Sequence, residues 1–241
     1  MITRKYKIAD KVVEVTSIYA EVHKYCADYQ TDDQADYSVT TTQADIDFER
    51  EKSAREDEIE GIPTRHFSDS YLEELAVYRK IAEKMLDFDT VLFHGSVIAV
   101  DGVGYLFTAK SGTGKSTHTR LWREYFGERA VMVNDDKPLL HIADTVTAYG
   151  TPYNGKHRLG TNTSVPLKAI CILTRAENNH IEPITREHYT MLLQQVYRPA
   201  DMLKMVKTLE LVDRLADGVK LYRLGCNMDI SAAQVAFEGM Q

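Results

Sequence analysis

The sequence predicts an α/β fold with a mixed sheet, preceded by a smaller α+β region. From residue 91 onward, strand-like and helix-like patterns alternate along the chain, which is typical of α/β domains. Residues 1–88 differ, because short β-branched runs come first and acid-rich, helix-like segments follow. The 241 residues are 44% hydrophobic, which is enough for a real core. We therefore predict a small N-terminal region, residues 1–88, and a larger domain, residues 89–241.

The N-terminal region is predicted to open with a hairpin and to end with a helix. Residues 45–60 are dense in acid and predict either a solvated helix or a mobile loop. The final helix has a cap at Asp69 or Ser70 and apolar residues at helical spacing. The predicted elements are strands at 5–8 and 12–16 around a turn at 9–11, a strand at 37–42, and the helix at 69–88.

The larger domain is predicted to begin with a second hairpin. Asp101-Gly102 is a strong two-residue turn signal between two strand-like runs. A later amphipathic helix, 202–215, is expected to bury Met202, Val206, Leu209, Val212 and Leu215. The predicted strands are 91–100, 103–108, 130–133, 169–174 and 219–224, and the predicted helices are 116–126, 202–215 and 231–240.

Composition argues against several classes of partner. The formal net charge is -7 and there is no Lys/Arg run, so we expect no nucleic acid. No apolar run reaches the ~20 residues of a membrane helix, and the N-terminus lacks the apolar segment of a signal peptide. Three widely spaced cysteines fit neither a metal site nor a disulfide framework, so we expect reduced thiols and a cytoplasmic location.

A glycine-rich loop between a strand and a helix resembles a phosphate-binding P-loop. Gly114-Lys115-Ser116 fits the end of that pattern, and Ala109 replaces its first glycine. Backbone N–H groups and the helix N-terminus would hold phosphate oxygens, Lys115 would reach the β- and γ-phosphates, and Ser116 would ligate Mg²⁺. The alternative is a glycine-rich turn without a ligand. The predicted nucleotide-binding residues are Ser111, Gly112, Thr113, Gly114, Lys115, Ser116 and Thr117.

Two aspartates and a histidine are candidates for the chemistry beside this loop. Asp135 and Asp136 follow an apolar strand about 20 residues after Lys115, where P-loop proteins place the acid that manages Mg²⁺. The alternative is a polar turn that ends the strand. If Asp101-Gly102 is a two-residue turn, then His94 falls opposite Ala109, at the start of the loop. A structural histidine is the alternative there.

These motifs resemble the catalytic domain of bacterial HPr kinase/phosphorylase. The resemblance lies in His94-Gly95-Ser96-Val97-Ile98-Ala99-Val100, in Ser111-Gly112-Thr113-Gly114-Lys115-Ser116, and in the acid pair after Asn134. The glycine-rich loop is also similar to that of ATP-type phosphoenolpyruvate carboxykinase, which shares the nucleotide-binding core. The resemblance implies a P-loop core of this type, with ATP and Mg²⁺ bound.

The resemblance also implies a role for each candidate. Asp135 and Asp136 would supply the catalytic base and a metal contact, His94 would support the base, and Lys115 and Ser116 would serve the phosphates and Mg²⁺. From its own composition, the polar and basic loop Lys156-His157-Arg158 is a candidate for binding the acceptor or the γ-phosphate. A solvated hairpin tip is the alternative, and Arg198 is a weaker candidate.

We therefore predict a Mg-ATP-dependent kinase, or one that uses another nucleoside triphosphate. Its acceptor would be a hydroxyl group, on a serine of a protein or peptide or on a small molecule. The alternative is a nucleotide-binding regulatory or scaffold protein without turnover. A third hypothesis, carboxykinase-like chemistry on a carboxylic acid, would need a further metal site and a basic pocket. Because HPr kinase is an oligomer, a homo-oligomer is a further expectation.

Overall fold

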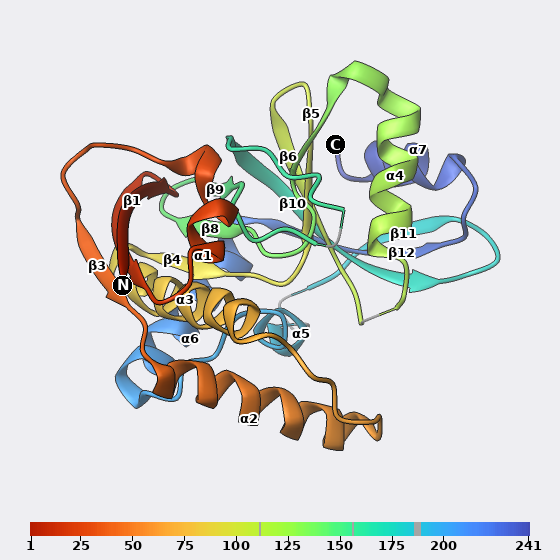
Figure 1. Ribbon diagram of the computed structural model, residues 1–241. Coiled ribbons are helices and arrows are strands. Elements are labelled where there is room, and N and C mark those ends of the chain that lie inside the picture. The colour runs from red at the N-terminus through yellow and green to blue at the C-terminus, as the bar shows by residue number, and fades with distance from the viewer. Residues whose placement is uncertain (111, 156, 186–188) are drawn as a thin grey trace. The chain divides into compact units, whose positions relative to one another are not determined.

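The computed structural model describes residues 1–110, 112–155, 157–185 and 189–241. The chain divides into two compact units, Met1–Lys84 and Met85–Gln241. Helices and strands are combined in both units (Figure 1). In the part of the chain that is described, no helix has the length and apolar character needed to cross a membrane. The predicted boundary between a small region, residues 1–88, and a larger domain, residues 89–241, stays a prediction.

The first unit is a three-stranded sheet with helices. β1 and β2 form the predicted antiparallel hairpin, and β3 pairs with β2 in parallel. Ala9 and Asp10 both have positive φ, so the turn has two residues and not three. The acid-rich segment is a helix, α2, which starts with a capping box formed by Thr42 and Asp45. The elements are β1 (Ile2–Ile8), β2 (Lys11–Ser17), α1 (Glu21–Tyr25), β3 (Tyr37–Thr40), α2 (Gln43–Glu60) and α3 (Asp69–Met85).

The second unit is built on a mixed sheet, as the sequence predicts. Its described strands run in the order β4-β8-β9-β10-β6-β5-β7, with β12 beside β10 and β11 beside β12. β6, β10 and β12 are parallel to one another. The strands are β4 (Thr90–Leu92), β5 (Ser96–Val100), β6 (Val103–Thr108), β7 (Ala130–Asn134), β8 (Leu139–Ile142), β9 (Val146–Tyr149), β10 (Ser164–Arg175), β11 (His180–Pro183) and β12 (Lys220–Cys226).

Helices cover both faces of this sheet. Along β5, Val97 and Ala99 face one hydrophobic cluster, together with Leu211 and Leu215 of α6. Ile98 and Val100 face the opposite cluster, which α4 and α7 complete (Figure 1). This alternation is what a sheet buried on both sides requires. The helices are α4 (Lys115–Phe126), α5 (Tyr189–Leu193), α6 (Met202–Gly218) and α7 (Ser231–Gly239).

Two predictions about this unit are wrong in detail. Residues 91–100 are not one strand, because β4 pairs with β8 whereas β5 pairs with β6 and β7. The break lies at Phe93–Gly95, where the N–H of His94 donates a hydrogen bond to the carbonyl of Gln195. The buried face of α6 is also shifted. Met202 and Val206 are exposed, and the buried residues are Thr208, Leu211, Val212 and Leu215.

Candidate functional site

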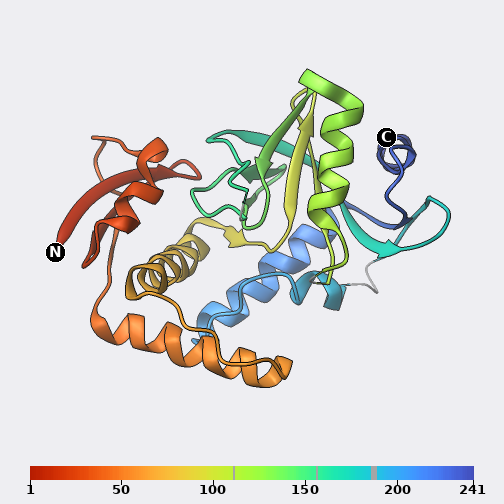
Figure 2. The same ribbon diagram turned by 45° about the vertical axis from the view of Figure 1, so that its right-hand side comes forward.

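The candidate site lies at one edge of the second unit's sheet. β7 is antiparallel to β5, as β6 is, so β7 runs in the same direction as β6, β10 and β12. The carboxyl ends of these four strands therefore lie along one edge of the sheet, and the segment after β6 leads into α4, the light-green helix in Figure 2. In α/β sheets, ligands bind outside this edge.

The glycine-rich loop, residues 109–114, connects β6 to the N-terminus of α4. Gly112 and Gly114 have φ of 75° and 125°, a conformation that glycine adopts without strain. Ala109 is buried in the core and is not among the residues with positive φ, so alanine is tolerated at the first loop position. Of the predicted nucleotide-binding residues, Ser111 lies outside the described residues, and the others belong to this loop or the first turn of α4.

Lys115 starts α4 and points back along the loop. Its ammonium Nζ lies 3.4 Å from the carbonyl oxygen of Ala109 and 3.4 Å from Nε2 of His94. Burial lowers the pKa of Lys115, and the negative charge of Asp136 opposes that shift only in part. A partly buried cation therefore lies between the glycine-rich loop and the break between β4 and β5.

The predicted hairpin register places His94 beside the loop. β5 and β6 pair from Val100 opposite Val103 to Ser96 opposite Phe107, which confirms the two-residue turn. Beyond this ladder, the hydroxyl of Thr108 donates to the carbonyl of His94 at 3.0 Å. The His94 side chain is 42% exposed, so its ring is open to a ligand.

Asp136 completes a cluster with these two side chains. Its Oδ1 lies 3.5 Å from Nε2 of His94, and its Oδ2 lies 4.0 Å from Nζ of Lys137. Burial alone would raise the pKa of Asp136. The hydrogen bond from His94 and the charges of Lys137 and Lys115 outweigh burial and lower that pKa. Asp136 is therefore an ionised carboxylate at neutral pH.

A buried asparagine fixes the turn that presents the acid pair. The side-chain oxygen of Asn134 accepts from the N–H groups of Asp136 and Lys137, at 2.9 and 2.6 Å. Its amide nitrogen donates to the hydroxyl of Thr151 at 3.0 Å, and that hydroxyl donates to the carbonyl of Lys137. Asn134 and Thr151 are fully buried, so the turn is rigidly held. The sequence indicated a turn-forming role for Asn134 but gave no signal for Thr151.

Asp135 has a different partner. Its Oδ1 accepts from the backbone N–H of Gly155 at 2.6 Å, which attaches the predicted acceptor loop to the acid pair. The N–H of Arg158 donates to the carbonyl of Gly155, and Arg158 has a φ of 48°. His157 and Arg158 are exposed, whereas Lys156 lies outside the described residues. The two aspartates thus diverge, one toward Lys115 and the other toward this loop.

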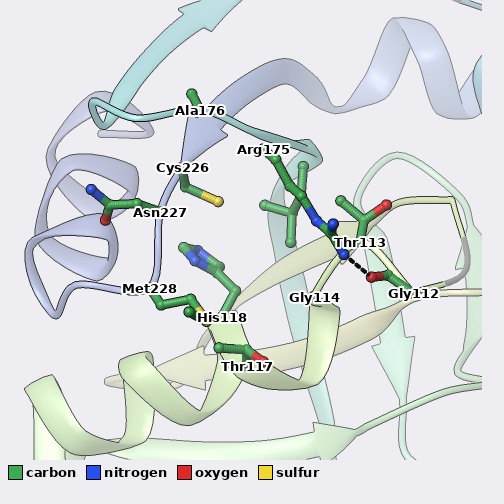
Figure 3. Close-up of a pocket in the computed structure, with 11 residues that line it drawn as sticks. Gly112, Thr113, Gly114, Thr117, His118, Arg175, Ala176, Cys226, Asn227 and Met228 are labelled. Carbon is green, nitrogen blue, oxygen red and sulfur yellow. Dashed lines mark hydrogen bonds between the residues drawn. The ribbon is translucent and has the colours of Figure 1, made fainter.

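A pocket between the glycine-rich loop and the ends of β10 and β12 contains residues that sequence reasoning missed. Arg175, at the end of β10, donates from its guanidinium to the carbonyl of Gly112 at 2.6 Å (Figure 3). The pocket beside this contact has a volume of about 520 Å³ and is also lined by His118, Cys226 and Met228. Arg175 directly follows a predicted strand, and that position was the available signal. Arg198 is exposed, near the segment that pairs with residues 92–94.

Among the residues that the structure describes, no single group of side chains outlines a metal site. Within the described ranges, no three or more His, Cys, Asp or Glu side chains are grouped closely enough to hold an ion. Mg²⁺ at nucleotide sites is held by one or two carboxylates, with phosphate oxygens and water as its other ligands. The predicted ligands Ser116, Asp135 and Asp136 therefore stay a prediction.

Comparisons with known proteins identify a family for the chain. No curated protein matches it. Among solved structures, the Hpr(Ser) kinase/phosphatase from Coxiella burnetii is similar over 61% of this chain and 95% of that chain, at 10% identity and a TM-score of 0.35. Such a score does not establish a shared fold. The family model that matches is a different one, described as SynChlorMet cassette protein ScmC, and it covers residues 70–228. The chain therefore belongs to the ScmC family.

Proposed function

We propose that this protein transfers the γ-phosphoryl group of Mg-ATP, or of another nucleoside triphosphate, to a hydroxyl group. The observation that carries this proposal is the cluster of Lys115, His94 and Asp136 beside a glycine-rich loop at the N-terminus of α4. Phosphoryl transfer needs a bound polyphosphate, a cation near the transferred group and a base for the hydroxyl. In this proposal the cluster supplies the cation and the base, and the loop supplies the binding site for the polyphosphate.

The glycine-rich loop and the first turn of α4 are the proposed polyphosphate site. The positive φ values of Gly112 and Gly114 let the backbone approach phosphate oxygens without a Cβ in the way. The N-terminus of α4 adds its free N–H groups and the positive end of its dipole. Lys115 would turn from His94 and the carbonyl of Ala109 toward the β- and γ-phosphates. Thr113, Ser116 and Thr117 complete the proposed nucleotide-binding residues, with Ser111.

We assign the base to Asp136. Its carboxylate would accept the proton of the acceptor hydroxyl as that oxygen forms its bond to the γ-phosphorus. The bond from the γ-phosphorus to the bridging oxygen breaks at the same time, and the electron pair leaves with the diphosphate. His94 acts as a positioning residue that holds the Asp136 carboxylate through Nε2, and Lys115 offsets the charge on the phosphoryl oxygens.

The remaining acid, Asp135, and Ser116 fit a Mg²⁺ site. Ser116 is exposed in the first turn of α4, and Asp135 is a half-buried carboxylate at the end of β7. Hydroxyl and carboxylate oxygens are the ligands that Mg²⁺ takes beside phosphates. When bound, Mg²⁺ would neutralise phosphate charge in the transition state. Asp135 also holds Gly155, so it links this end of the site to the acceptor loop.

The acceptor is proposed to bind on the side of His157 and Arg158; Lys156, the third residue predicted for this role, lies outside the described residues. The exposed side chains of His157 and Arg158 lie on the loop that Asp135 holds, so a serine of a protein or peptide, or a small hydroxyl compound, would approach the base from there. In this scheme residues 89–241 form the kinase-like catalytic domain, with a P-loop core of the HPr kinase and phosphoenolpyruvate carboxykinase type. Residues 1–88 form the smaller region.

A phosphate-transfer screen tests the proposal. The purified full chain is incubated with Mg²⁺, γ-labelled ATP and separate pools of free serine, small alcohols and serine peptides. Label in one pool, absent for Lys115→Ala and present for the surface control Lys220→Ala, is the expected result. ATP binding without label in any pool would favour the alternative, a regulatory nucleotide-binding protein without turnover.

A further inference from the structure

The pocket beside the glycine-rich loop lies on the β10 and β12 side of β6, whereas the acid pair follows β7, on the other side of β6 in the strand order. Gly112 and Thr117 form one wall, and the ends of β10 and β12 with the residues that follow them form the other, with Arg175, Cys226 and Met228 (Figure 3). Its volume of about 520 Å³ lies within the range of small-molecule sites, and most of its lining is apolar. Because it shares Gly112 with the proposed polyphosphate site, the two are continuous.

The lining of this pocket includes a histidine whose proton position can be deduced. His118 is 2% exposed, and the indole N–H of Trp122 donates to its Nε2 at 3.0 Å. An indole nitrogen can only donate, so Nε2 of His118 must be the unprotonated acceptor. The proton of the neutral ring is therefore on Nδ1. Burial lowers the pKa of His118 to about 3, which keeps the ring neutral at physiological pH.

The Nδ1–H of His118 is a buried donor. It has no hydrogen-bond partner within the described part of the chain. A buried donor without an acceptor is costly, and native structures rarely leave one unpaired. His118 lines the pocket near Cys226 and Met228 (Figure 3), so this unpaired donor belongs to the wall of a space that a ligand can occupy.

We infer that this pocket holds the nucleoside part of the nucleotide, and that His118 donates from Nδ1 to a ring nitrogen or carbonyl oxygen of the base. This inference rests on the proposed function, because the triphosphate would lie on the adjoining loop. Apolar side chains such as Met228 suit the faces of a base, and every nucleobase carries an acceptor on its edge. Arg175 holds Gly112 and so couples the pocket wall to the loop.

Binding of Mg-ATP is compared with binding of Mg-tripolyphosphate, which has the phosphates but no nucleoside. The wild type is expected to bind Mg-ATP more tightly than Mg-tripolyphosphate. His118→Phe should weaken Mg-ATP binding roughly tenfold, the value of one hydrogen bond, and leave tripolyphosphate binding unchanged. His118→Asn, which places an amide near the position of Nδ1, should recover part of the loss. Lys115→Ala should weaken both ligands.

Thiol labelling gives a second readout that needs no variant of His118. Cys226 is half-buried in the pocket wall, whereas Cys26 and Cys171 are buried. Iodoacetamide should therefore modify Cys226 first, and Cys226→Ser identifies the labelled peptide by mass spectrometry. Mg-ATP should slow this modification several-fold, and Mg-tripolyphosphate should not.

The outcomes separate this inference from the proposed function. If neither Mg-ATP nor Mg-tripolyphosphate binds, the proposed polyphosphate site is wrong, and the inference is overturned with it. If both bind but His118→Phe keeps wild-type affinity for Mg-ATP, and Mg-ATP leaves the labelling of Cys226 unchanged, then the nucleoside lies elsewhere. The inference is then overturned while the proposed function stands. A folded His118→Phe protein is verified by its thermal transition.

Discussion

The ammonium Nζ of Lys115 lies 3.4 Å from Nε2 of His94, and the same Nε2 lies 3.5 Å from a carboxylate oxygen of Asp136. An ammonium only donates and an ionised carboxylate only accepts. The one nitrogen of His94 therefore either accepts from Lys115 or donates to Asp136. If a bound polyphosphate draws Lys115 away, Nε2 is left to donate to Asp136. Nucleotide binding would then position the proposed base.

The two aspartates should differ in their effect on turnover. Asp136→Asn removes the proposed base and should lower kcat by roughly 10²- to 10⁴-fold, with Mg-ATP affinity nearly unchanged. Asp135→Asn keeps Asp136 but weakens the Mg²⁺ contact and the acceptor of the Gly155 N–H. It should raise the Mg²⁺ concentration needed for half-maximal rate. Steady-state kinetics with varied Mg²⁺ separates the two. Wild-type kcat in Asp136→Asn would refute the assignment of the base.

Loss of His94 should move the acid limb of the pH profile. A hydrogen bond from His94 helps to lower the pKa of Asp136. Without it that pKa rises, so a base that works only when ionised loses activity at a higher pH. The acid limb of kcat should shift upward in His94→Ala. His94→Gln places an amide near the position of Nε2 and should move the limb back. A merely structural role for His94 would lower kcat at every pH without shifting the limb.

Gly150 should not tolerate a side chain. A Cβ there would lie 1.8 Å from the carbonyl oxygen of Thr161 and 2.7 Å from that of Val133. Both are backbone atoms, so the end of β7 and the segment at Thr161 would have to move. Gly150→Ala should lower the free energy of unfolding by about 3 kcal/mol. Gly218→Ala is the matched control, because its Cβ would make an ordinary contact at 3.7 Å. Denaturant unfolding compares them, and equal midpoints would refute the packing.

Glu73 should be essential to the first unit. It is fully buried in α3, and its carboxylate accepts from the N–H groups of Ile18 and Tyr19 and from the hydroxyl of Thr41. Glu73→Ala would remove the buried acceptor that these three donors share and should destabilise the unit by about 3 kcal/mol. The exposed Glu51→Ala should change stability by less than about 0.5 kcal/mol. Thermal unfolding measures both, and a stable Glu73→Ala protein would contradict the expected cost.

Turn chemistry carried much of what the sequence could predict. A two-residue hairpin turn needs positive φ at both positions, and Asp101-Gly102 is a sequence that adopts it. The turn therefore predicted the register of β5 and β6. That register brought His94 to the start of the loop. Alanine at the first loop position could also be accepted from the sequence, because the backbone of Ala109 does not have the positive φ that favours glycine.

Contacts between distant segments were beyond prediction. The break at His94 depends on the carbonyl of Gln195, a hundred residues later. Thr151 holds the turn after β7 only because it accepts a hydrogen bond from the side chain of Asn134, seventeen residues earlier. His118 occupies an ordinary buried position on the helix, and nothing in its spacing shows that Trp122 fixes its tautomer. The pocket beside it is formed by the ends of separate strands, so it exists only in the folded chain.

The most direct test of the central claim is calorimetric titration of Mg-ATP into the wild type, Lys115→Ala and the surface control Lys220→Ala. A charged hydrogen bond from Lys115 to phosphate is worth about 1.5–3 kcal/mol, so its loss should weaken binding roughly 10- to 100-fold. The wild type and Lys220→Ala should bind Mg-ATP alike, and Lys115→Ala should lose most of this affinity. Equal affinity in all three proteins would contradict a triphosphate site at the glycine-rich loop.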